Sequence, residues 1–118
     1  MKFKRIMKNI NTCLFNKTCT PYQGTIPPLA PEVASRLLLE LQNDWIINKS
    51  GQLCKEYSFN NFINAMKFAN KIAELAEIEA HHPDLAISWG KCIVRIWTHK
   101  INDLTENDFI LAAKIDAL

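Results

Sequence analysis

The fold is decided by residues 77–99, which read EIEAHHPDLAISWGKCIVRIWTH. The first of these residues continue a helical pattern, and Pro83 ends that helix because the residue before a proline is pushed out of helical backbone. Residues 85–89 and 92–99 then have the composition of strands, and Gly90-Lys91 supplies a turn between them. The stretch therefore predicts a helix that leads directly into a β-hairpin.

Outward from this hairpin, the periodicity predicts the remaining elements. Apolar side chains at helical spacing define the helix before it; they are Phe62, Ala65, Met66, Ala69, Ile72, Ala73 and Ala76. Asn60 or Asn61 is expected to cap its start. Pro31 opens an earlier helix, residues 45–47 and 53–59 read as strands, and Thr105 opens a last helix. The order α-β-β-α-β-β-α predicts an α+β fold: a four-stranded, largely antiparallel sheet with helices packed on one face.

Length and charge define the domain organisation. A chain of 118 residues, 48% hydrophobic and 22% charged, is typical of one soluble domain. Five of the fourteen basic residues precede the first acidic residue, Glu32, so residues 1–28 are predicted to be a flexible basic tail and residues 29–118 a single domain. The slightly acidic balance of that domain argues against nucleic-acid binding. No apolar run is long enough for a secretory signal or a membrane span, and we expect a cytoplasmic protein.

Four cysteines, at positions 13, 19, 54 and 92, bear on the redox state. Cys13 and Cys19 could form a bridge or hold a metal. Because no second pair stands at metal-ligand spacing, reduced thiols are the favoured interpretation. Cys54 and Cys92 lie in strand-like runs and are expected to pack as small hydrophobic side chains.

All three histidines fall within residues 81–99. Histidine is the side chain best suited to proton transfer near neutral pH. Glu77 and His81 are four residues apart, so the carboxylate could orient the imidazole across one helix face. The helix C-terminus also favours a cation there. Both features suit His81 as a general acid; the alternative is a histidine cap with a surface ion pair.

The other candidates admit similar alternatives. His82 precedes a proline, so it is extended and points away from His81; it is expected to bind substrate or to pack on the sheet. His99 closes a strand, where it borders a cleft or is simply exposed. Thr105 and Asp108 have the spacing of a capping box, and the same carboxylate could orient His99. Three histidines and an acid could ligate zinc, but adjacent histidines diverge in extended chain, so no metal is predicted.

These residues occur in an order that resembles the pterin-4a-carbinolamine dehydratase family, also called 4a-hydroxytetrahydrobiopterin dehydratases. The matching elements are Glu77-x-x-x-His81-His82-Pro83, Trp89-Gly90-Lys91, Thr98-His99, Leu104-Thr105-x-x-Asp108 and Ala112-Ala113-Lys114-Ile115-Asp116. The resemblance covers roughly residues 28–117. One departure is that Asn102-Asp103 leads into Leu104 where the family has a glycine. Because asparagine and aspartate tolerate left-handed backbone, the turn is expected to persist.

The resemblance implies an activity and a set of roles. The family's enzymes are hydro-lyases that convert 4a-hydroxytetrahydropterin to quinonoid dihydropterin by histidine acid/base catalysis, with no cofactor. It implies catalytic roles for His81, His82 and His99, with Glu77, Pro83 and Asp108 in support; whether His81 or His99 is the acid stays open.

The resemblance also implies partners. The pathway partner would be an aromatic amino acid hydroxylase, phenylalanine hydroxylase, and the assembly a homodimer or homotetramer. The alternative function is a non-catalytic dimerisation co-activator that binds a transcription factor.

Overall fold

The computed structural model describes residues 14–20, 27–41 and 44–118. Its helices and strands are α2 (Pro31–Leu41), β1 (Ile46–Ile47), β2 (Leu53–Ser58), α3 (Phe62–Glu79), β3 (Asp84–Ser88), β4 (Lys91–Ile96) and α4 (Glu106–Asp116). The predicted order α-β-β-α-β-β-α is confirmed.

One antiparallel sheet runs in the order β1-β2-β4-β3. The predicted hairpin is the pair β3–β4, in which Ile87 lies opposite Cys92. Gly90 turns this hairpin at a φ of +74°, and a Cβ there would meet the Phe59 carbonyl oxygen at 3.0 Å. Glycine is therefore required at position 90, both for its positive φ and because the Phe59 carbonyl leaves no room for a side chain.

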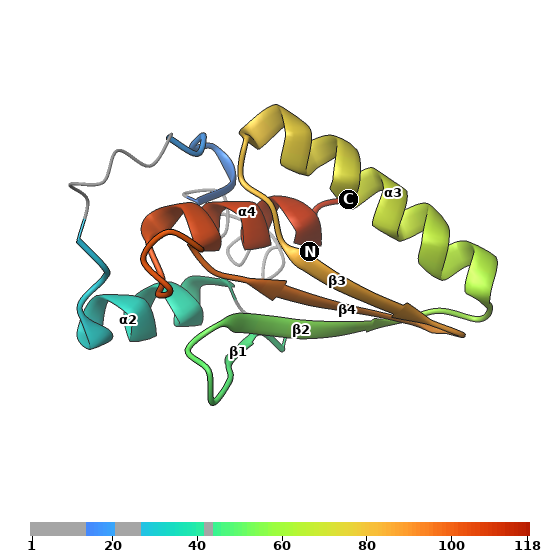
Figure 1. Ribbon diagram of the computed structural model, residues 1–118, viewed down its shortest axis with the longest axis horizontal. Coiled ribbons are helices and arrows are strands. Elements are labelled where there is room, and N and C mark those ends of the chain that lie inside the picture. Colours follow the sequence, from blue (N-terminus) through green and yellow to red (C-terminus); the bar gives the residue numbers. More distant parts are fainter. Residues whose placement is uncertain (1–13, 21–26, 42–43) are drawn as a thin grey trace, which may run out of the picture.

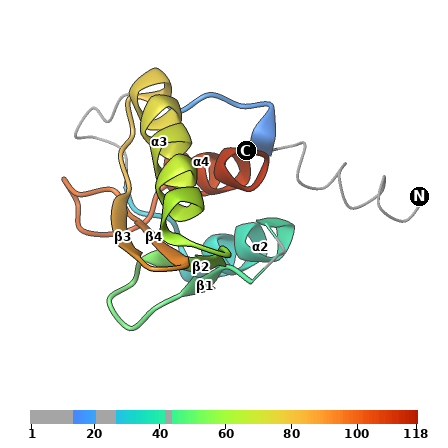
Figure 2. The ribbon, with the colours of Figure 1, turned by 90° about the vertical axis from the view of Figure 1, so that its right-hand side faces the viewer.

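The three long helices cover one face of the sheet, as predicted, and α4 lies between α2 and α3 (Figures 1 and 2). The sheet contributes alternate residues to the core, which is the period-two pattern of a half-buried strand; Leu53, Cys92, Val94 and Ile96 are all fully buried. Every residue of α4 from Asn107 to Ala113 is also buried. Because α4 is surrounded on all sides, polar side chains in its first turn become buried too.

Helix α3 begins and ends with distinct caps. Asn61, one of the two predicted caps, accepts the Asn64 amide at 2.8 Å through Oδ1. At the other end, Ala80 adopts left-handed backbone with a φ of 54°. The helix thus stops before Pro83, and the chain reverses at Ala80.

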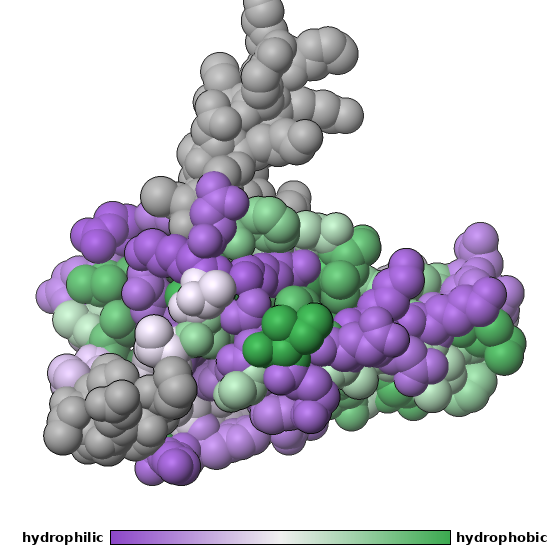
Figure 3. Space-filling model, turned by 90° about the horizontal axis from the view of Figure 1, so that it is seen from above, coloured by the Kyte–Doolittle hydropathy of each residue, from purple (hydrophilic) through white to green (hydrophobic). Residues whose placement is uncertain are grey.

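The face seen from above in Figure 3 is mostly polar, with separate apolar patches.

Residues 14–20, which we call the N-terminal strap, pack on the domain. The Leu14 side chain is 1% exposed and belongs to the hydrophobic core. The strap lies within the stretch predicted to be a flexible tail, so this part of the tail contributes to the folded domain. Positions 1–13 and 21–26 lie outside the described residues. Within the described ranges, no helix has the length and apolar character needed to cross a membrane.

Candidate active site

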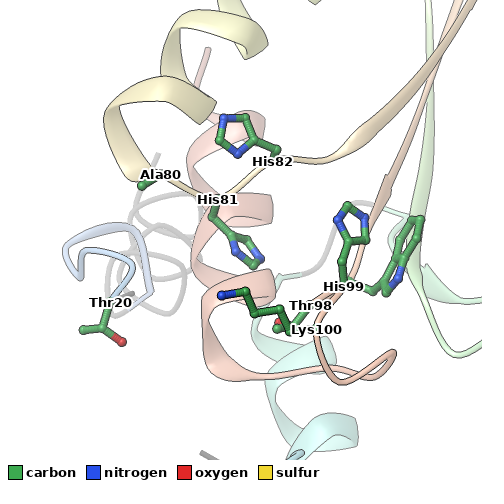
Figure 4. Close-up of a pocket in the computed structure, with 8 residues that line it drawn as sticks. Thr20, Ala80, His81, His82, Thr98, His99 and Lys100 are labelled. Carbon is green, nitrogen blue, oxygen red and sulfur yellow. The ribbon is translucent and has the colours of Figure 1, made fainter. Parts of the chain in front are cut away.

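A cavity of about 360 Å³ opens where the end of α3, the end of β4 and the strap meet (Figure 4). Its lining residues are Thr20, Ala80, His81, His82, Trp97, Thr98, His99 and Lys100. The fold thus brings together the three histidines that the sequence singled out. Trp97 is half-buried and contributes an aromatic wall.

His81 is held by a buried carboxylate. Its Nε2 lies 2.6 Å from Asp108 Oδ1, and the Asp108 side chain is fully buried. The other Asp108 oxygen accepts the Thr105 amide at 2.8 Å and the Thr98 hydroxyl at 3.0 Å. Three partners therefore fix this carboxylate, and through it the imidazole.

The capping box predicted for Asp108 is present. The predicted contact with His99 is wrong, because the carboxylate binds His81 instead. The reason is the left-handed residue Ala80, which directs His81 toward the first turn of α4. The capping position of Asp108 in that turn places its carboxylate next to the His81 imidazole.

Glu77 binds His82 rather than His81. Its Oε2 lies 2.7 Å from His82 Nε2, and both side chains are more than half exposed. The expectation that Glu77 would orient His81 assumed continuous helix between them. Because α3 ends at Glu79, His81 has left that helix face and His82 has taken the position within reach.

His99 packs edge-on against Trp97, with ring centroids 4.3 Å apart and an interplanar angle of 77°. Its Nε2 lies 3.8 Å from Asp84 Oδ1, and both side chains are about half exposed. His99 therefore faces the cavity from β4's end with an aromatic support and a loosely placed acid. Asp84 was not predicted as a neighbour; it begins β3, next to the end of β4 in the sheet.

The turn after His99 forms as expected without a glycine. Asn102 takes a φ of 53°, and its amide donates to the His99 carbonyl at 3.2 Å. The Thr98 amide donates to the Asp103 carbonyl at 2.9 Å. Asparagine thus supplies the left-handed backbone that a glycine would otherwise supply, and the turn keeps His99 at the cavity.

Not every residue predicted for the site lines the cavity, and some residues that were not predicted do line it. Pro83 does not line the cavity; it leads the chain from His82 into β3. Thr20 and Lys100 do line it, although the sequence did not predict them as site residues. Lys100 follows Thr98-His99 directly, which was an available signal, whereas Thr20 carried none. Among the described residues, no group of three or more His, Cys, Asp or Glu side chains could share a metal ion.

The comparisons with known proteins identify one family. The family model described as Pterin 4 alpha carbinolamine dehydratase matches residues 27–118. A relative from Rickettsia bellii strain OSU 85-389 is 62% identical over 91% of this chain and 96% of its own length. One from Methylococcus capsulatus is 50% identical over 86% of this chain and 90% of its own. Both carry the family's name as a provisional assignment.

A solved structure agrees with this result. The crystal structure of a protein from Brucella melitensis, described as a transcriptional coactivator/pterin dehydratase, superposes with a TM-score of 0.71. The two sequences are 26% identical, and the match covers 77% of this chain and 97% of the Brucella chain.

Proposed function

Because the chain belongs to the pterin-4a-carbinolamine dehydratase family, we propose that it removes water from 4a-hydroxytetrahydropterin to give quinonoid dihydropterin. The observation that carries this proposal is that His81, His82 and His99 line one cavity. A concave site with convergent ionisable groups is what a small-molecule lyase requires.

The reaction needs two proton transfers. The C4a–O bond breaks and the hydroxyl group leaves as water, so it must take a proton from a general acid. N5 gives its proton to a general base, and its electron pair forms the new double bond. One proton enters and one leaves, and no external oxidant or reductant is needed. Each such transfer typically contributes about 10²–10⁴-fold to the rate.

We assign the two transfers to His81 and His99. Asp108 occupies Nε2 of His81, which leaves Nδ1 as the ring nitrogen that exchanges a proton with substrate. The His99 ring packs edge-on against Trp97. About half of the His99 side chain is exposed, so a bound pterin could reach it. His82, paired with Glu77, binds the substrate, and Pro83 holds the extended backbone that separates His82 from His81.

The proposal extends to the protein's cellular partners. Quinonoid dihydropterin is first reduced, and an aromatic amino acid hydroxylase then uses the reduced pterin again. Phenylalanine hydroxylase is therefore the proposed pathway partner. We propose a homodimer or homotetramer that acts in the cytoplasm and needs no cofactor.

The alternative, a non-catalytic co-activator module, fits the first half of the name given to the Brucella protein. A module that only binds a transcription factor has no need for three histidines around one cavity, or for a buried carboxylate that orients one of them. The site geometry therefore favours the enzyme.

The test is a dehydration assay on the full chain with 4a-hydroxytetrahydropterin, run with and without excess chelator. We expect turnover in both conditions. His81→Ala and His99→Ala should each lower turnover by about tenfold or more while circular dichroism stays unchanged. Asn70→Ala, an exposed change in α3 outside the cavity, is the control. Absence of turnover in the wild type, or wild-type rates in both histidine variants, would refute the proposal.

A further inference from the structure

The strap is bound to the helix ends by hydrogen bonds in addition to apolar burial. Asn107 Oδ1 accepts the Thr20 amide at 3.0 Å, and Asn107 Nδ2 donates to the Thr20 carbonyl at 2.6 Å. The Asn107 side chain thus pairs with Thr20 as a neighbouring backbone strand would. Asn107 is 8% exposed, whereas Thr20 is exposed, so both bonds are partly buried and join the strap to a buried side chain.

A second anchor holds the residue before Thr20. The Cys19 amide donates to Glu79 Oε1 at 2.9 Å, and Lys114 Nζ lies 2.6 Å from Glu79 Oε2. Burial by itself would raise the pKa of Glu79, but the hydrogen bonds from Cys19 and Lys114 together hold it below its usual value. Glu79 is therefore an anion that links the strap to α4.

The strap anchors are neighbours of the residues that position His81. Asn107, which holds Thr20, precedes Asp108, which holds His81. Glu79, which holds Cys19, stands two residues before His81, across the left-handed Ala80. The same two helix ends thus place both the imidazole and the strap, and Thr20 lies across His81 from His99 in Figure 4.

We propose that the strap is the substrate-binding wall facing His99, and that Asn107 is the positioning residue that holds this wall in place. The inference rests on the proposed function, because the ligand that contacts the wall is the pterin. Thr20 closes the cavity on the strap side, so a strap released from Asn107 leaves that side of the pterin exposed to water. Release should weaken substrate binding, whereas the proton transfers at His81 and His99 keep their partners.

Asn107→Asp in the full chain tests the proposal. The substitution keeps an acceptor for the Thr20 amide but sets a carboxylate against the Thr20 carbonyl. A negative charge in the first turn of α4 favours the helix, so α4 should persist. Asn70→Asp makes the same chemical change on the exposed face of α3 and is the matched control. Asn107→Ala is the second variant, since it removes both hydrogen bonds without adding charge.

The first readout is Cys19 itself. Burial and the Glu79 charge raise the pKa of its thiol to about 12, so at pH 8 the wild-type thiol should react slowly with iodoacetamide. Release of the strap should speed alkylation at Cys19 by about tenfold or more, because the reactive form is the thiolate. Peptide mass spectrometry separates Cys19 from the other cysteines.

The second readout is kinetic. We expect KM to rise about fivefold, which is the size of effect that losing one hydrogen bond to the substrate would have. The value of kcat should stay within about twofold of wild type. A purely structural strap would lower the melting temperature and leave KM alone. Faster alkylation with wild-type KM would overturn the role in binding, and unchanged alkylation in both Asn107 variants would overturn the positioning role.

A binding measurement separates this proposal from the proposed function. The dissociation constant of a dihydropterin, measured by fluorescence quenching, needs no turnover. A wild type that binds dihydropterin more tightly than Asn107→Asp but does not dehydrate substrate would support the strap and refute the dehydratase assignment. A wild type that binds no pterin would overturn both.

Discussion

Two adjacent histidines each bind a carboxylate at nearly the same distance, yet in opposite surroundings. His81 and Asp108 are 2.6 Å apart, with side-chain exposures of 13% and 0%. His82 and Glu77 are 2.7 Å apart, with exposures of 55% and 78%. The distance between the imidazole nitrogen and the carboxylate oxygen therefore does not distinguish the two pairs. The distinction comes from burial and from the additional donors to Asp108.

The free energies should differ accordingly. Removing a buried carboxylate leaves each of its buried donors unsatisfied, which costs about 1–3 kcal/mol for each group. An exposed pair contributes about 0–1 kcal/mol, since water replaces the lost partner. The buried pair can hold an imidazole in one orientation, whereas the exposed pair can exchange with solvent and with a ligand.

The largest effect is expected from Asp108→Ala. It removes the partner of His81 and the acceptor for Thr105 and Thr98 together. Because three donors lose their acceptor, we expect a loss of about 3–5 kcal/mol in the free energy of unfolding, measured by urea denaturation. Asp108→Asn should lose less, because it retains an acceptor for the cap, yet its turnover should fall. A loss below about 1 kcal/mol for Asp108→Ala would show that the pair behaves as an exposed one.

A kinetic comparison of the two histidines sharpens the contrast. His81→Ala should act mainly on kcat, since it removes a proton-transfer group. His82→Ala should act mainly on KM, by about tenfold or less, because an exposed side chain contributes binding alone. Steady-state kinetics on both variants, with Asn70→Ala as control, provide the test. A loss of kcat in His82→Ala equal to that in His81→Ala would contradict this division of roles.

The element order could be predicted because its signals are local. Apolar spacing, Pro31, the Asn61 cap and the turn at Gly90 each act within a few residues, and the structure agrees with them. The convergence of the histidines was anticipated through the family resemblance, because the residues themselves only placed them at the ends of neighbouring elements.

The pairing of acids and histidines could not be predicted in the same way. It depends on left-handed backbone at Ala80, a conformation that alanine rarely adopts and that no sequence rule signals. Thr20 and Asn107 are 87 residues apart, and their pairing depends on the packed helix ends. Residues 14–20 were predicted to be tail because Leu14 and Phe15 form only a short apolar run in an otherwise polar, basic stretch.

Glu79 provides an intermediate case, a buried acid near the same helix end. Its pKa is lowered in the folded protein, so its contribution is complete above its unfolded pKa, about 4.3. That contribution is lost as pH falls through the lower folded value. Glu79→Gln should cost about 1.5–3 kcal/mol at pH 7, as for hydrogen bonds to a charged group. The difference from wild type should shrink toward pH 3, measured by urea denaturation across that range. A constant difference at all pH values would contradict the linkage.

The smallest effect is expected from Glu77→Gln, which removes the charge of the exposed pair. Water can reach both side chains, so the free energy of unfolding should change by less than about 1 kcal/mol. The remaining attraction should also be screened by salt, so the variant and wild type should converge further in 0.5 M sodium chloride. Double-mutant cycles with His82→Ala, run beside a cycle of Asp108→Asn with His81→Ala, measure the two coupling energies directly. A coupling for Glu77 and His82 as large as that for Asp108 and His81 would mean that distance, rather than burial, governs these pairs.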